Sequence, residues 1–302
     1  MPNLGPPRCE SRVGNPVDAS IGNKYELFDG YGANYFGVQF FISYNSLDPR
    51  LRLLSPLGNK FRHVFERSLE ISEDQIQAHR HDGKMLVFQK QAGEWVLAGS
   101  ETHGLLSQTS TGYRHILEEG VVEEYDQSGL LLSLRNIAGG GIDFEYDLPL
   151  GAGGDGRDDS LDRAVDQRGR VISFGYQVFP GPTTTPYYRL TTVNVPGGQL
   201  DLAFDQPYGR LRSIGYPGGH SKKLRFRSTE GVQYFLLRGV TDESDIDFSS
   251  FIYSTNSDLA TTTEHSGDVD RYTFNYGASS TTVGTPLGAI FSYRHQKVAD
   301  AP

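Results

Sequence analysis

Short segments in which apolar and polar residues alternate follow one another along most of the chain. This alternation, with a period of two, is typical of half-buried β-strands. The most apolar run, Tyr35 to Tyr44, is far shorter than the ~20 residues of a membrane-spanning helix and predicts a buried strand. The sequence therefore predicts an all-β fold. The alternating segments are residues 85–90, 94–100, 171–179, 200–205, 223–228 and 271–276.

Residues 67–80 are the best candidate for a helix. Their apolar positions, 69, 71, 75 and 77, fit neither a period of 3.6 nor a clean alternation. Ser72, Glu73 and Asp74 instead predict a turn between two strands.

Two kinds of turn alternate between residues 125 and 220. In one kind, an Asp caps its own turn and a Gly three or four residues later supplies a positive φ. In the other kind, a pair of glycines makes the turn. The expected turn residues are Asp126, Gly129, Asp166, Gly169 and Gly209 for the first kind, and Gly197 and Gly218 for the second.

An aromatic residue ends a strand at a similar spacing in each unit. The intervals of 30, 28, 22, 27 and 23 residues indicate an internal repeat in which each unit packs on its neighbours. An ordinary β-sandwich with regular hairpins is the alternative. The predicted fold is a set of antiparallel hairpins that form a twisted, curving sheet, a partial shell. The aromatic residues are Tyr146, Tyr176, Phe204, Phe226, Tyr253 and Tyr276.

The Gly/Asp-rich residues 151–160 interrupt the repeats. We therefore expect an irregular arm over 1–24, an N-terminal β domain over 25–150, a loop over 151–160, a β-repeat array over 161–295 and a tail over 296–302.

Composition excludes several functions. The net charge of −9, from 28 Lys+Arg and 37 Asp+Glu, argues against binding to nucleic acid or to an anionic membrane surface. The single Cys9 excludes an internal disulfide and a Cys-based zinc site. The N-terminus lacks the apolar core of a secretory signal peptide. The 36 glycines fit a fold with many turns.

The N-terminal residues carry a family resemblance. The run Gly14, Asn15, Pro16, Val17 and Asp18, followed by Gly22, Asn23 and Lys24, resembles the opening of the N-terminal domain of Rhs (rearrangement hotspot) and YD-repeat proteins, including wall-associated-protein-like members.

Later segments resemble the same family in the same order. They are Phe40 to Ser46; Leu57 to His63, with Lys60 and Phe61 where Gly and Trp are usual; Asp82 to Phe88; Tyr125 to Leu130; and the Gly-Arg heads at Gly169 and Gly209.

The resemblance implies a spiralling β-sheet shell that encloses a C-terminal toxin in bacterial polymorphic toxins, and a secreted or cell-surface location. The chain holds no toxin domain and ends before the family's autoproteolytic aspartate region, so we expect an N-terminal piece or a short relative. Expected partners are further shell segments or a second copy. The final edge near Ala289 to Tyr293 should favour such self-association.

Few residues suggest metal binding. His79 and His81 have the spacing of two ligands on one strand face, but no third ligand follows, and Asp82 fits a hairpin turn. Residues 155–162 are acidic, yet their order fails the EF-hand pattern. We predict no metal and no cofactor.

Enzymatic patterns are also weak. Glu118 with Glu119, or Glu123 with Glu124, could serve a glycoside hydrolase, but neighbours on a strand point to opposite faces. No nucleophile elbow is present. The sequence therefore predicts a non-enzymatic structural module, with such a hydrolase as the third choice.

The second choice is a carbohydrate or cell-surface binding module, in which aromatic rings would stack on sugars. The same rings would equally fill a core. They are Tyr35, Phe36, Phe40, Phe41, Tyr44, Tyr187, Tyr188, Tyr234, Phe235, Phe248, Phe251 and Tyr253.

Overall fold

The computed structural model describes residues 5–6, 11–35, 38–48, 55–98, 104–117, 120–136, 140–146, 160–180, 187–206, 208–226 and 234–294. Within these residues the fold consists of β-strands and one short 3-10 helix, η1 (Ser266–Asp268). The strands before the main sheet are β1 (Arg12–Val13), β2 (Val17–Asp18), β3 (Tyr25–Tyr35), β4 (Val38–Asn45) and β5 (Phe61–His63).

The main sheet contains all later strands. They are β6 (Ser68–Ile71), β7 (Gln75–His79), β8 (Met85–Gln91), β9 (Glu94–Leu97), β10 (Leu105–Gln108), β11 (Gly112–Ile116), β12 (Val122–Asp126), β13 (Leu131–Arg135), β14 (Gly141–Tyr146), β15 (Leu161–Asp166), β16 (Val171–Phe179), β17 (Tyr187–Val195), β18 (Gly198–Phe204), β19 (Leu211–Gly215), β20 (Ser221–Phe226), β21 (Leu237–Thr241), β22 (Asp247–Tyr253), β23 (Ala260–His265), β24 (Val269–Tyr276), β25 (Ser280–Gly284) and β26 (Ile290–Arg294).

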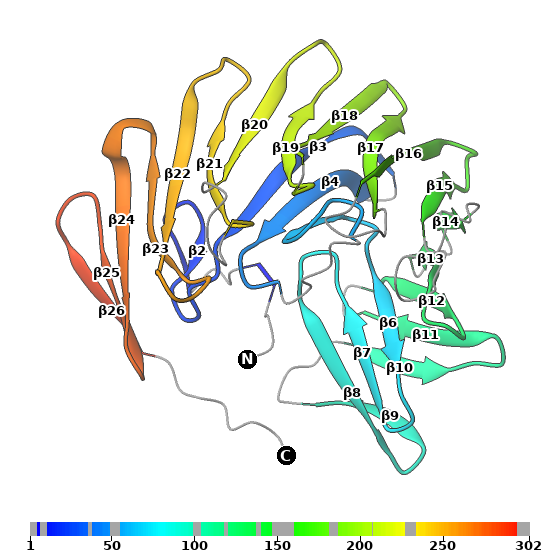
Figure 1. The fold of residues 1–302 in the computed structure, drawn as a ribbon. Coiled ribbons are helices and arrows are strands. Elements are labelled where there is room, and N and C mark those ends of the chain that lie inside the picture. The colour runs from blue at the N-terminus through cyan, green and yellow to red at the C-terminus, as the bar shows by residue number, and fades with distance from the viewer. Residues whose placement is uncertain are drawn as a thin grey trace.

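These strands pair antiparallel in sequence order, so the sheet is a series of hairpins (Figure 1). The sheet curls strongly but stays open, because the ladders of its end strands, β6 and β26, do not join them to each other. The predicted all-β, antiparallel, curving sheet is therefore confirmed. Residues 67–80 form two paired strands, β6 and β7, rather than a helix.

The first part of the sheet curls back on itself. Ser68 of β6 forms a bridge with Leu130, beside the β12–β13 turn, and the Leu69 amide donates to the Gly129 carbonyl at 2.9 Å. Among the described residues, strands on both sides of residues 151–160 belong to the same main sheet, since β14 pairs with β15.

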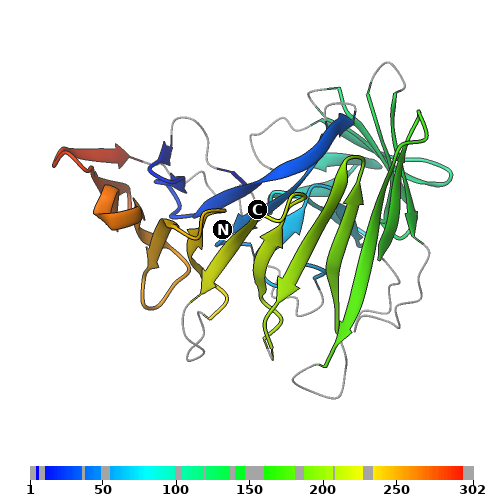
Figure 2. The same cartoon turned by 90° about the horizontal axis from the view of Figure 1, so that it is seen from above.

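A small sheet of β3, β4 and β5 packs on the inner side of the curved sheet, as Figure 2 shows from above. Aromatic rings form the interface: Phe40 lies 6.0 Å from Phe174 of β16, and Phe61 lies 6.2 Å from Phe226 of β20. Phe40, Phe61 and Phe174 belong to the buried hydrophobic core, and the partly buried Phe226 packs against it. The side chains of the small sheet thus form part of the core against which the hairpins pack.

Residues 11–24 contain the short β1–β2 hairpin and bury Val17 and Lys24 completely. This ordering comes from contacts with strands far along the chain, described below. In the part of the chain that the structure describes, no helix is long and apolar enough to cross a membrane.

Candidate functional site

The predicted Asp turns close hairpins through their own side chains. Asp126 Oδ1 accepts the Ser128 and Leu130 amides at 2.8 and 2.9 Å, and Asp166 Oδ1 accepts the Arg168 and Arg170 amides at 2.8 and 2.9 Å. Each carboxylate thereby satisfies amides that the tight turn leaves free.

The turn glycines lie in the left-handed region that favours glycine. Their φ values are +88° for Gly129, +73° for Gly169, +61° for Gly209, +108° for Gly197 and +97° for Gly218.

Aromatic residues form a row along one end of the hairpins, here called the aromatic rim. They lie in the second half of the even-numbered strands from β12 to β24, and a register shift directly precedes each of them except Tyr276. Such bulges bend a strand and increase its twist. The rim residues are Tyr125, Tyr146, Tyr176, Phe204, Phe226, Tyr253 and Tyr276.

Four rim tyrosines tie each hairpin to the preceding one. The Tyr146 hydroxyl donates to the Leu131 carbonyl at 2.8 Å, and Leu131 is the residue paired with the preceding rim residue, Tyr125. The same relation recurs for Tyr176 with Leu161, Tyr253 with Leu237 and Tyr276 with Ala260, at 2.9, 2.9 and 2.5 Å. The regular spacing of aromatic residues in the sequence therefore corresponds, at these four tyrosines, to a repeated hydrogen bond between consecutive hairpins.

Arginines make the inter-hairpin contact where the rim residue is Phe. Arg189 lies 5.8 Å from the Phe204 ring and donates to Gly209 O in the next turn at 3.0 Å. Arg210 lies 5.2 Å from the Phe226 ring and donates to Tyr234 O at 2.9 Å.

Both arginines are buried. Where the rim residue is Phe and has no hydroxyl, a buried arginine thus donates the hydrogen bond to the following hairpin.

The N-terminal motif, Gly14 to Lys24, docks on the last hairpins. Gly14 approaches Thr263 and Tyr272 so closely that a Cβ atom would lie 2.7 Å from Thr263 Oγ1. The Gly22 carbonyl accepts the Ala260 amide at 2.9 Å, and a Cβ atom on Gly22 would lie 2.9 Å from Leu259 Cδ2. Both glycines permit close packing over a separation of more than two hundred residues.

The rest of the motif joins this contact to the small sheet. Asp18 Oδ1 accepts the Ser20 amide at 2.9 Å, which closes the turn before Gly22. Asn23 Oδ1 accepts from Ser46 Oγ and from the Leu47 amide, both at 3.2 Å.

Lys24 is fully buried beside these contacts. Its Nζ contacts Glu26 Oε2 at 2.5 Å and lies 4.1 Å from the Phe251 ring. Burial lowers the pKa of Lys24 even though Glu26 favours its charged form. The lysine therefore belongs to the packing between the arm and β22.

The segment around Lys60 meets the main sheet at two places. Lys60 takes a φ of +71° and donates to Asp258 Oδ2 at 2.9 Å. Leu190 N donates to Pro56 O at 2.9 Å, and Arg189 Nη1 donates to Ser55 O at 2.9 Å.

Glu123 lies at the centre of a buried charged cluster. Its carboxylate accepts from both Nη atoms of Arg80, from Tyr125 Oη at 2.8 Å and from Arg67, and it contacts His115 Nδ1 at 3.2 Å. Burial alone would raise the pKa of Glu123, but Arg80 and Arg67 outweigh it and hold this pKa well below its usual range. Glu123 thus links β12 to Arg67, just before β6, and to Arg80, just after β7.

A second buried pair continues from this cluster to the small sheet. Arg62 of β5 contacts Asp48 through two nitrogens, at 2.5 and 2.6 Å, and donates to the Arg80 carbonyl at 3.1 Å. Arg80 therefore joins the small sheet through its backbone and the main sheet through its side chain.

The two histidines with metal-ligand spacing are not brought together as ligands. His79 ends β7 and contacts Glu70 at 3.3 Å, whereas His81 lies in the following turn with its ring 5.5 Å from Phe41. The described residues contain no cluster of three His, Cys, Asp or Glu side chains that could hold a metal ion. Cys9, Glu118, Glu119 and residues 155–159 lie outside the described residues.

The pair Glu123 and Glu124 is split between the two sides of the strand. Glu123 is buried in its cluster, while Glu124 is exposed beside Arg114, at 3.8 Å. Sequence reasoning missed the role of Glu123, because the arginines that surround it are distant in sequence: Arg67 lies just before β6, and Arg80 lies just after β7.

The candidate sugar-binding aromatics are mostly core residues where they are described. Phe40, Tyr44, Phe251 and Tyr253 are buried, and Phe248 is 48% exposed. Phe41, Tyr188, Tyr234 and Phe235 are half-buried. The side chains of Tyr35, Phe36 and Tyr187 lie outside the described residues.

Comparisons with known proteins give one family match. Residues 14–88 match the family model described as Domain of unknown function (DUF6531). This range contains the docked motif, the small sheet and the first strands of the main sheet. No curated protein matches the chain.

Two of the solved structures that match this chain are likenesses at low identity. The first is "Crystal Structure of TcdB2-TccC3", with 11% identity and a TM-score of 0.25 over 85% of this chain and 18% of that chain. The second is the Photorhabdus luminescens Tc holotoxin pore with the mutation TccC3-D651A, with 12% identity and a TM-score of 0.24 over 87% of this chain and 16% of that chain. The chain thus spans less than a fifth of either structure's chain.

Proposed function

We propose that this chain is a non-enzymatic structural module that forms the N-terminal end of a β-sheet shell, of the kind that it resembles in Rhs and YD-repeat proteins. The repeated contact at the aromatic rim carries this proposal. Because four hairpins bind the preceding one through the same tyrosine hydrogen bond, such as Tyr176 to Leu161, and buried arginines link the others, a wall can be extended hairpin by hairpin.

The N-terminal region supports a position at a closed end of the shell. The small sheet occupies the inner side of the curve, and the Gly14 to Lys24 motif joins it to β22, β23 and β24. The finer part of the proposal is that the wall continues from this end around a C-terminal toxin, which it encloses and helps to deliver.

The surroundings of Glu123 support a structural rather than a catalytic role. A general acid needs a raised pKa and access to substrate. Glu123 has a lowered pKa and no exposed surface, and it is held by two arginines.

The test is to express the full open reading frame that encodes this chain. The purified product is then examined by cryo-electron microscopy and limited proteolysis. We expect a hollow β wall that begins with residues 68–294 and protects an enclosed segment from protease. A double variant, Tyr253→Phe with Tyr276→Phe, should loosen the rim and increase cleavage of that segment. Tyr272→Phe, a nearby tyrosine outside the rim, is the matched control.

A product without an enclosed segment would overturn the encapsulation proposal. Turnover of a glycan by the wild type, abolished in Glu123→Gln at a pH where that variant is still folded, would overturn the non-enzymatic proposal.

A further inference from the structure

The turn between β7 and β8, residues 80–84, lies against one face of the small sheet. The Ser43 hydroxyl donates to the His81 carbonyl at 2.9 Å, and the Asn45 side-chain amide donates to the Asp82 carbonyl at 3.0 Å. Both donor side chains are buried. The turn therefore covers this part of β4.

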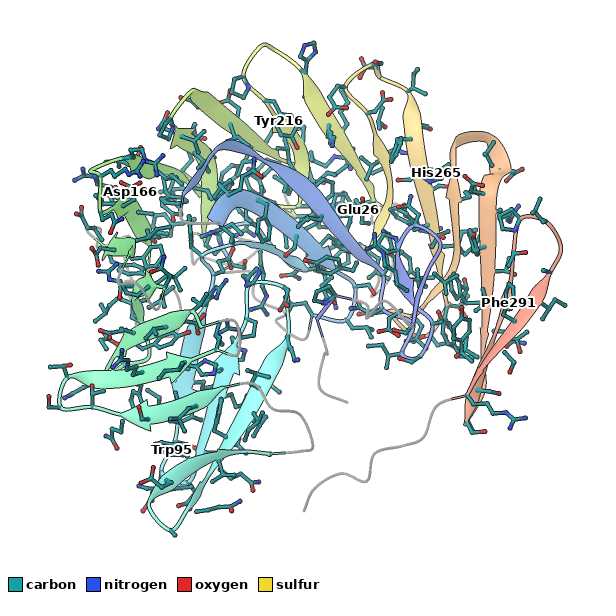
Figure 3. The ribbon with its side chains drawn as sticks, turned by 180° about the vertical axis from the view of Figure 1, so that it is seen from behind. Glu26, Trp95, Asp166, Tyr216, His265 and Phe291 are labelled. Atoms are coloured by element: carbon teal, nitrogen blue, oxygen red, sulfur yellow. The ribbon has the colours of Figure 1, made fainter. Side chains whose placement is uncertain are left out.

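Figure 3 shows the two parts of the molecule that meet at this turn. They are the curled first part of the main sheet, with Trp95 on β9, and the small sheet, with Glu26 on β3. A change at the turn thus affects how these two parts are joined.

The His81 ring is the group in this turn that can change its charge near neutral pH. The half-buried ring packs edge-on against the Phe41 ring of β4, with 5.5 Å between centroids. Its Nδ1 atom is buried and has no hydrogen-bond partner among the described residues. An imidazolium carries a proton on both nitrogens, so protonated His81 would have a buried Nδ1–H without an acceptor, which is costly.

The charges around His81 also oppose its protonation. Those that face the ring are Arg62 of β5, Arg67 before β6, Arg80 in the turn and Glu123 of β12. Glu123 is already paired with both Arg67 and Arg80, and the adjacent Asp82 directs Oδ1 to the Lys84 amide at 2.8 Å. Burial, together with the arginines, lowers the pKa of His81 well below its usual value.

We propose that residues 80–84 form an acid-sensitive latch, which leaves the small sheet when His81 is protonated and takes the imidazolium into water. Release breaks the hydrogen bonds that Ser43, Asn45 and Arg62 donate to carbonyls of the turn. It breaks no backbone pair of β4, β7 or β8. The opening is therefore local, and it exposes the side chains of Ser43 and Asn45.

The pH dependence of the latch follows from linkage. His81 has the ordinary pKa of ~6.5 in the open turn and a lower pKa in the closed turn, so protons favour opening below that value. The opening equilibrium constant should rise roughly thirtyfold between pH 8 and pH 5. The inference goes beyond the proposed function, because it holds whether or not a wall encloses a segment.

The experiment is thiol labelling of Ser43→Cys with methyl methanethiosulfonate in the 302-residue chain with Cys9→Ser. Each rate is divided by the rate of the urea-unfolded chain at the same pH, which yields the opening equilibrium. We expect the roughly thirtyfold rise from pH 8 to pH 5, and the same rise for Asn45→Cys, a second site under the turn. Ser249→Cys is the control, since Ser249 is buried on β22 and its hydroxyl has no hydrogen-bond partner to lose; its labelling should not rise.

Two further variants identify the responsible histidine. His81→Phe keeps a ring against Phe41 and the carbonyl that accepts from Ser43, but it cannot bind a proton, so the rise should disappear. His63→Phe should leave the rise unchanged, because His63 lies between Phe40 and Phe174, against the main sheet. No rise at Ser43→Cys and Asn45→Cys, a rise that persists in His81→Phe or disappears in His63→Phe, or an equal rise at Ser249→Cys would each overturn the proposal.

Discussion

The Tyr146 hydroxyl donates to the carbonyl of Leu131, 2.8 Å away, and Leu131 is itself paired with the rim residue of the preceding hairpin. This relation repeats along the rim and is replaced by a buried arginine where the ring is Phe. The spacing of the aromatic residues thus reflects the hydrogen bonds that join consecutive hairpins.

Removal of one rim hydroxyl should destabilise the fold measurably. Tyr176→Phe deletes the 2.9 Å bond to the Leu161 carbonyl and leaves that acceptor buried, so the free energy of unfolding should fall by ~1 kcal/mol. Urea denaturation followed by tyrosine fluorescence measures the change. Tyr272→Phe, a tyrosine off the rim, should change it much less. Equal effects would show that the rim bonds do not hold the hairpins.

Substitution of the two neighbouring glutamates of β12 should reduce the free energy of unfolding by very different amounts. Glu123→Gln leaves Arg67 and Arg80 buried without their anion and should cost ~3–5 kcal/mol. Glu124→Gln breaks only an exposed pair with Arg114 and should cost ~0–1 kcal/mol. Thermal unfolding of both variants compares them. A small effect of Glu123→Gln would contradict the cluster's structural role.

Substitution of two turn glycines with similar φ should also destabilise the fold by different amounts. Gly169→Val should cost ~1–3 kcal/mol through backbone strain alone, because no atom lies within 4 Å of its Cβ position. Gly129→Val should cost a further ~1–3 kcal/mol, because its Cβ position lies 2.1 Å from the Leu69 carbonyl oxygen and β6 must move. An unchanged melting temperature in Gly169→Val would refute the turn assignment.

Docking of the N-terminal motif should depend on Gly22. Gly22→Ala and Gly267→Ala share the same φ of +74°, but only Gly22 is crowded, by Leu259 and Tyr276. Hydrogen exchange at the Ala260 amide, which donates to Gly22 O, should therefore accelerate in Gly22→Ala only. Equal exchange at the Ala260 amide in both variants would mean that the contacts of Gly22 do not determine how the N-terminal motif docks.

Stability should fall as the pH drops below about 6.5. Burial between the Phe40 and Phe174 rings lowers the pKa of His63 to about 3, and burial, with Arg67 and Arg80, lowers the pKa of His81 well below its usual value. The unfolded chain, with a His pKa of ~6.5, binds these protons first, so each histidine's contribution is complete above ~6.5 and is lost as the pH falls through that value toward the folded pKa.

For His63 the loss at pH 5 should be ~2 kcal/mol. The depressed pKa of Glu123 adds a separate loss only below the usual glutamate range of ~4.3. Chemical denaturation between pH 5 and 8 isolates the histidines, and His63→Phe should flatten the profile. His220→Asn, at an exposed position, is the control. A wild-type profile as flat as that of His63→Phe would contradict this prediction.

Much of the fold could be read from the sequence, because hairpins depend on local chemistry. Alternation predicted strands such as β16 and β24, and the turn pattern at Asp166 and Gly169 depends on residues only a few positions apart. The aromatic period predicted a repeat, although not the hydroxyl bond that it carries. The same local signals gave no hint that Glu123 would be the centre of a charged cluster.

The sequence by itself therefore determined the strands, the turns and the order of pairing, since each is set by neighbours along the chain. Only the tertiary structure decided what the curved sheet encloses and which distant groups meet there. The Asn15 amide reaches Thr263 Oγ1, 248 residues away, and Arg80 reaches both Glu123 and Arg62. These contacts depend on accumulated bend and twist, to which every bulge along the sheet contributes, and no local stretch of sequence fixes that sum.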